Sequence, residues 1–235
     1  MKWLRKSSLL MAVLAAATVA LVAAPASAVL PLRSPQVGFN IAPLQNYLNV
    51  VDPGINVATD QVDAQVWSVS ITGNSDFTLM LKNHLGTNAS VGVYNGKDPN
   101  PIPALFQVFP GGAVAGYYAT LHFAGGNLTV SLFNQNAAFL GNTFYPGVDQ
   151  NFFGFYIQGP GGLWLSQDDR NPPPGGAPQM LTYNSVALPG DFWLCWDAGP
   201  YSGLATFDDV VINVQSIRPT PAATTTWGDV KSKYR

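Results

Sequence analysis

Short runs of β-forming residues recur along this chain, separated by turn residues about every 8–12 positions, and they limit the possible folds more than any other feature of the sequence. We interpret Val62–Trp67 and Val210–Val214 as alternating runs, with the period typical of strands that have one buried face. Turn signals such as Gly73-Asn74 and Gly125-Gly126-Asn127 lie between the runs. No segment keeps a sustained helical period. The pattern therefore predicts an all-β fold, an antiparallel β-sandwich of jelly-roll-like type.

The predicted strands are Val62–Ile71, Phe77–Leu81, Ser90–Tyr94, Leu105–Phe109, Tyr117–Phe123, Leu128–Phe133, Phe152–Gln158, Leu163–Ser166, Gln179–Tyr183, Phe192–Trp196 and Val210–Ile217. The segment Ala42–Val51 fits either a short helix or an opening strand.

The N-terminus has the three parts of a secretory signal peptide, which we assign to residues 1–28. Basic residues Lys2, Arg5 and Lys6 precede the apolar run Leu9–Val22, and Ala26-Ser27-Ala28 forms a cleavage site. The alternative, a membrane anchor, is disfavoured by the break at Pro25. No later run approaches the ~18 apolar residues that span a bilayer, so we expect no transmembrane segment after cleavage. The predicted location is extracellular or at the cell surface, with the periplasm as the alternative.

The C-terminal residues 218–235 differ in composition from the body, residues 29–217, which we predict to be a single sandwich domain. Arg218–Thr226 is rich in Pro and Thr, which predicts a disordered linker. A basic, aromatic tag, Trp227–Arg235, follows and resembles the TTWG-x-(V/I)-K-x-x-(Y/F)-R endings of secreted bacterial proteins. This tag is either a frayed tail or a signal read by a secretion or sorting receptor.

The charge distribution excludes one class of partner. The chain has no Glu, and its body carries twelve Asp against four basic residues, a net charge near −8. Such an acidic surface argues against nucleic-acid binding. Cys195 is the only cysteine, so no intrachain disulfide forms, and its apolar neighbours Leu194 and Trp196 indicate a buried structural thiol rather than a nucleophile.

Clustered aspartates in the C-terminal half suggest a metal site. The candidates are Asp168, Asp169, Asp197, Asp208 and Asp209. Ca²⁺ takes 6–8 oxygen ligands, which these carboxylates and loop carbonyls supply if the loops converge. The competing interpretations are solvated turn residues and a hydrolase that uses two opposed carboxylates. His84 and His122 have no partner at zinc-site spacing.

The block of residues 152–217 also carries a family resemblance. Phe153-Gly154-Phe155-Tyr156, Trp164–Asn171, Gln179–Tyr183 and Phe207-Asp208-Asp209-Val210-Val211 follow the order of motifs in the bacterial "domain of unknown function 4114" family, which this region resembles. The resemblance implies a secreted or surface protein with an acidic site and no established activity. This chain departs from the pattern where the family has Glu and a D-x-D, the latter replaced by Leu204-Ala205-Thr206.

These observations predict a secreted bacterial surface, matrix or ligand-binding module that is calcium-stabilised and non-catalytic, with a carbohydrate-active or other hydrolase as the alternative. Aromatic side chains are the candidate contacts for a glycan or for a surface or matrix partner. They are Tyr117, Tyr118, Tyr145, Phe152, Tyr156, Trp164 and Tyr201.

Overall fold

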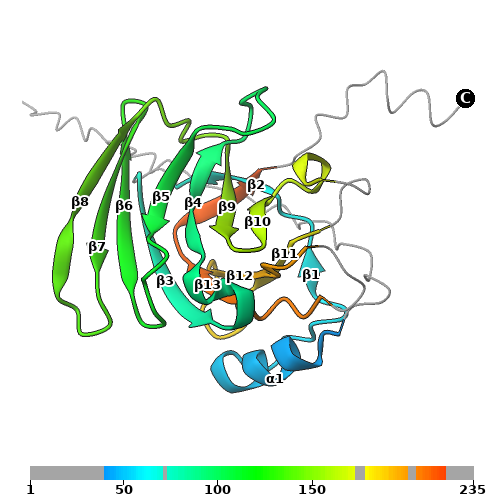
Figure 1. The fold of residues 1–235 in the computed structure, drawn as a ribbon. Coiled ribbons are helices and arrows are strands. Elements are labelled where there is room, and N and C mark those ends of the chain that lie inside the picture. The colour runs from blue at the N-terminus through cyan, green and yellow to red at the C-terminus, as the bar shows by residue number, and fades with distance from the viewer. Residues whose placement is uncertain (1–39, 71–72, 173–177, 201–204, 221–235) are drawn as a thin grey trace, which may run out of the picture.

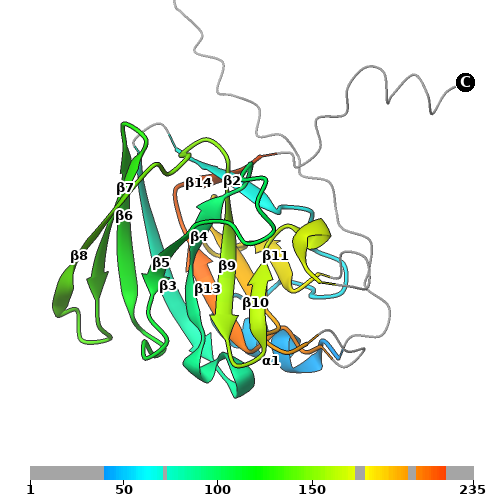
Figure 2. The same ribbon diagram turned by 45° about the horizontal axis from the view of Figure 1, so that its top comes forward.

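Two antiparallel sheets pack face to face in the computed structural model, which describes residues 40–70, 73–172, 178–200 and 205–220 (Figures 1 and 2). In spatial order, the eight-stranded sheet contains β1 (Gln61–Val62), β11 (Met180–Asn184), β12 (Phe192–Trp196), β13 (Val210–Val214), β3 (Asn74–Lys82), β6 (Tyr118–Ala124), β7 (Asn127–Phe133) and β8 (Phe139–Pro146). The six-stranded sheet contains β14 (Ile217–Thr220), β2 (Val66–Val69), β9 (Phe153–Gly159), β4 (Ser90–Asn95) and β5 (Leu105–Phe109), and β10 (Gly162–Leu165) pairs with β9. The predicted all-β sandwich is confirmed.

The main core lies between the sheets and is built by alternation along each strand. In β13, Val210, Ile212 and Val214 face this core because successive side chains point to opposite faces. Aromatic rings fill the centre: Trp67 meets Phe192 edge-on with ring centroids 4.9 Å apart. This arrangement explains why the aromatic-rich strands of the sequence are buried.

A second core lies on the outer face of the eight-stranded sheet, beneath α1 (Ala42–Val51). Leu44 and Leu48, one helical turn apart, are fully buried against residues that include Trp193 and Val211. The ambiguous segment Ala42–Val51 is therefore a helix. Figure 1 shows α1 beneath the β11–β13 end of the sheet, while β6, β7 and β8 extend to the opposite end.

Two predicted strands are divided in the structure. The run Val62–Ile71 begins in β1 of the larger sheet and continues in β2 of the smaller one. The run Val210–Ile217 breaks at Ser216, whose φ of 59° is left-handed, and β14 then pairs with β2. Residues 218–220 of the predicted linker therefore belong to the sandwich.

The edge strand β8 is a long described strand that was not predicted at all. Its apolar and polar residues do not alternate, so its sequence lacks the usual strand pattern. The predicted signal peptide and the tag Trp227–Arg235 lie outside the described residues. In the described ranges, no helix has the length and apolar character needed to cross a membrane.

Candidate metal centre

Three loop segments meet at one end of the eight-stranded sheet. The short 3₁₀ helix η1 (His84–Asn88) follows β3, and the other two segments follow β12 and precede β13. The backbone N–H of Asn83 donates to the carbonyl of Asp209 (2.7 Å), and that of Asp209 donates to the carbonyl of Trp196 (3.1 Å). These ladder-like bonds place His84 beside the Asp208-Asp209 pair.

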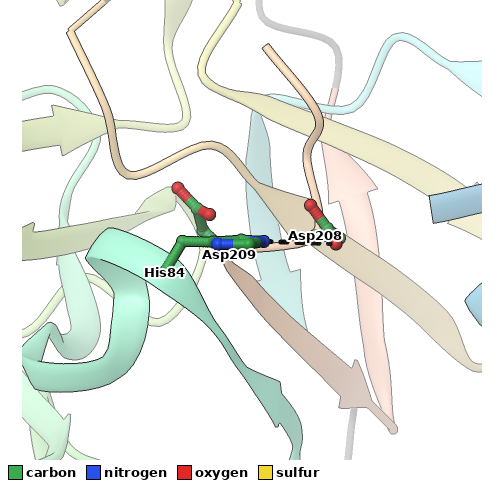
Figure 3. A group of neighbouring side chains, drawn as sticks. All are labelled: His84, Asp208 and Asp209. Atoms are coloured by element: carbon green, nitrogen blue, oxygen red, sulfur yellow. Dashed lines mark ion pairs between the residues drawn. The ribbon is translucent and has the colours of Figure 1, made fainter. Parts of the chain in front are cut away.

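His84, Asp208 and Asp209 each contribute one potential ligand atom to a compact group (Figure 3). The three atoms lie within 4.8 Å of one another, and His84 Nε2 is 4.0 Å from Asp208 Oδ2. The imidazole is largely exposed, whereas both aspartates are buried. One nitrogen and two carboxylate donors at this spacing match the ligand types of a divalent cation.

Asp197 lines a cavity of about 340 Å³ together with His84 and Asp209. Its Oδ1 accepts the Gly199 N–H (2.8 Å) and its Oδ2 accepts the Thr206 N–H (3.0 Å). Asp197 therefore holds the backbone of Gly199 and Thr206, and its negative charge lies beside His84 and Asp209.

In this cavity, ionised carboxylates are energetically unfavourable when no cation is bound beside them. Burial raises the pKa of Asp209 to about 6, against the lowering effect of a hydrogen bond from the Ala198 N–H (2.8 Å), and the charges of Asp197 and Asp208 raise it further. Burial also raises the pKa of Asp197. Oδ1 of Asp208 is buried and has no hydrogen-bond partner among the described residues. A cation would compensate these charges and bind the orphaned oxygen.

Two of the four described non-glycine residues with a left-handed backbone lie at the same place. His84 has φ 43° and Phe207, directly before Asp208, has φ 55°. Left-handed backbone is unusual for residues other than Gly, and such strain gathers at functional sites. Gly86 makes the close approach feasible, because a Cβ at this position would collide with the carbonyl oxygen of Asp209.

The structure brings together three of the five predicted metal ligands, Asp197, Asp208 and Asp209. Asp168 and Asp169 belong to η2 (Asp168–Arg170), a 3₁₀ turn after β10, and are not members of this group. The backbone N–H of Asp168 instead donates to Gln65 Oε1 (3.0 Å).

His84 is the site residue that sequence reasoning missed as a ligand. It is far from Asp208 in the sequence, and no zinc-type spacing marks it. The signal that could have found it is the pairing of the ends of β3 and β13, which are neighbouring strands.

Among the described residues, two of the predicted aromatic contacts are buried and four are half-buried. Tyr156 and Trp164 are buried, and Trp164 Nε1 donates to the carbonyl of Ala198 (3.1 Å), so both belong to the packing. Tyr145 donates to the carbonyl of Gln107 (3.0 Å). Tyr201 lies outside the described residues.

No protein-family model matches this chain, and no curated protein matches it. The resemblance of residues 152–217 to a family therefore stays a prediction.

Proposed function

We propose that this protein is a secreted, non-catalytic surface or matrix module in which His84, Asp208 and Asp209 hold a divalent cation. The buried, unpartnered Oδ1 of Asp208 beside two further carboxylates is the observation that supports this proposal. The cation would join η1 to the loops that flank β12 and β13, so that its binding stabilises this end of the sandwich.

The donor set favours a first-row transition ion over calcium. Imidazole suits zinc and similar ions, whereas Ca²⁺ prefers a shell made only of oxygen. Calcium, expected from the aspartates alone, would have to fill its larger shell with loop carbonyls and solvent. We therefore expect Zn²⁺ and Mn²⁺ to bind more tightly than Ca²⁺.

The hydrogen bonds and the burial of the carboxylates support a binding role rather than hydrolysis. A glycosidase needs two carboxyl groups that face the scissile bond. Both oxygens of Asp197 accept backbone N–H groups, as does Oδ2 of Asp209, and Asp208 is buried. Asp197 and Asp209 thus bind the loop backbone, and the buried Asp208 does not form with them an exposed pair of carboxyl groups that could face a scissile bond.

Thermal unfolding of chelator-treated protein tests the proposal. With the ion at about 100 times its Kd, stability rises by about 2.7 kcal/mol, which raises the Tm by roughly 5–10 °C in a domain of this size. The variants His84→Asn and Asp208→Asn should lose this response to Zn²⁺ and Mn²⁺. The matched control is His122→Asn, because His122 lies on β6 outside the group. A Tm that none of Zn²⁺, Mn²⁺ and Ca²⁺ changes would refute the proposal.

A further inference from the structure

Among the residues that the structure describes, the outer face of the eight-stranded sheet is covered over only one of its halves. Inner-facing residues of β6 and β7, such as Leu121 and Val130, pack into the core between the sheets. The side chains that alternate with them point away from the six-stranded sheet. The helix α1 packs on the half formed by β11, β12 and β13. We name the remaining half, from β6 to β8, the β6–β8 face.

The strand register arranges the β6–β8 face in three rows. The first row is aromatic: Tyr118 is opposite Phe133, and Phe133 is opposite Phe139. Tyr118 and Phe133 stack with centroids 4.5 Å apart, and Phe133 meets Phe139 at 5.4 Å. Phe139 is 57% exposed at the outer end of this row.

The second row is polar and runs beside the aromatic row. It contains Thr120, Ser131 and Asn142, which face one another across the three strands. The structure shows no hydrogen bond from these side chains to any described residue. Two hydroxyl groups and one amide are thus available to a ligand.

The third row ends in an aromatic residue on the edge strand β8. His122 is opposite Thr129, which is opposite Phe144. Phe144 is 62% exposed. An exposed ring therefore stands on each side of the polar row, on an open sheet surface.

We propose that the β6–β8 face binds an extended neutral polysaccharide. The apolar C–H faces of sugar rings stack on aromatic side chains, while sugar hydroxyls bond to hydroxyl and amide groups between them. Charge supports a neutral ligand: the three rows contain no Lys or Arg that would pair with an anionic polymer, and the next strand adds Asp76 opposite Thr120. A second copy of the chain is a poorer match for this face, because a symmetric contact would bury the polar row of one copy against the same polar row of the other.

Binding to polysaccharides tests this inference independently of the metal centre. The probes are microcrystalline cellulose and chitin in depletion assays, and soluble mixed-linkage β-glucan in affinity electrophoresis, with alginate as the anionic comparison. We expect binding to at least one neutral probe and weaker binding to alginate. The variants Tyr118→Ala, Phe139→Ala and Phe144→Ala should each weaken binding roughly threefold to tenfold, the range that stacking on one ring supplies.

Two further variants separate stacking from loss of folding. Phe144→Trp keeps a ring at the same exposed place and should retain binding, and Ile102→Ala removes an exposed apolar residue that lies outside the three rows. The inference is overturned if no neutral probe binds, if the Ala variants bind like the parent, or if alginate binds better. It is also overturned if the face instead mediates self-association, seen by sedimentation and lost in Phe144→Ala.

Discussion

Asp52 at the C-terminal end of α1 is the buried group whose removal should affect stability most. Its carboxylate accepts four hydrogen bonds: from Ser185 Oγ (2.7 Å), Trp193 Nε1 (2.7 Å), and the backbone N–H groups of Val186 (3.0 Å) and Ala187 (2.9 Å). These donors belong to the turn between β11 and β12 and to β12 itself. Asp52 thus attaches the helix to the sheet that it covers.

The magnitude follows from the donors that lose their acceptor. In Asp52→Ala, the indole N–H of Trp193 and the hydroxyl of Ser185 stay in buried positions without this partner, at about 1–3 kcal/mol each. The two backbone N–H groups are partly accessible to water and add less. We expect a loss of about 3–5 kcal/mol, a large share of the roughly 5–15 kcal/mol of a typical domain, and a fall in Tm of about 6–20 °C.

The assay is urea unfolding followed by tryptophan fluorescence. The control is Asp76→Ala, since Asp76 is an exposed strand residue whose side chain makes no hydrogen bond with the described residues, and it should change stability by less than about 0.5 kcal/mol. A loss below about 1 kcal/mol in Asp52→Ala would show that these hydrogen bonds do not provide the predicted stabilisation.

The pH dependence of the same variant gives a second check. Burial alone would raise the pKa of Asp52, but the hydrogen bonds from Ser185, Trp193, Ala187 and Val186 outweigh it, so that the pKa lies below its ordinary value. The stabilisation is therefore complete above the pKa of the unfolded chain, about 3.9. It is lost as the pH falls through the lower pKa of the folded state, so the difference between parent and Asp52→Ala should shrink in acid. A difference that does not change with pH would contradict this assignment.

Two other predictions concern the candidate metal centre and the buried thiol. Gly86→Ala should displace η1 from the Asp209 carbonyl and weaken cation binding, whereas Gly112→Ala, where a Cβ meets open space, should not; equal affinities in a metal titration would contradict this. The Cys195 thiol is buried, and burial with the nearby Asp208 charge raises its pKa, so it should react with a disulfide reagent only as fast as the protein unfolds. Rapid labelling of the native protein would contradict that expectation.

Most strands could be predicted because their pattern is local. In β13, Val210, Ile212 and Val214 enter the core between the sheets and Val211 enters the core beneath α1. Four of its five residues are therefore apolar, and such a run is recognisable in the sequence without knowledge of its neighbours. The strand β8 lacks such a pattern: Phe139, Leu140 and Phe144 are all exposed, and β7 is the only described strand that pairs with β8. Its position depends on an existing sheet edge rather than on its own hydrophobic pattern.

The candidate site could be predicted only in part for a similar reason. Asp208 and Asp209 stand out because they directly precede a strongly apolar strand. The contribution of His84 depends on the pairing of β3 with β13 and on the contact between Gly86 and the Asp209 backbone. The same holds for Asp52, whose four donors all come from a distant part of the chain.

Local periodicity and composition are enough to predict the strand-forming runs, the acidic charge of the body and the absence of an intrachain disulfide. Other features are visible only in three dimensions: Val62–Ile71 and Val210–Ile217 each divide between two sheets, α1 covers one half of an outer face, and His84 approaches the aspartates. These features arise from contacts between residues far apart in the chain, where strand pairing and core packing, rather than local preference, set which side chains meet.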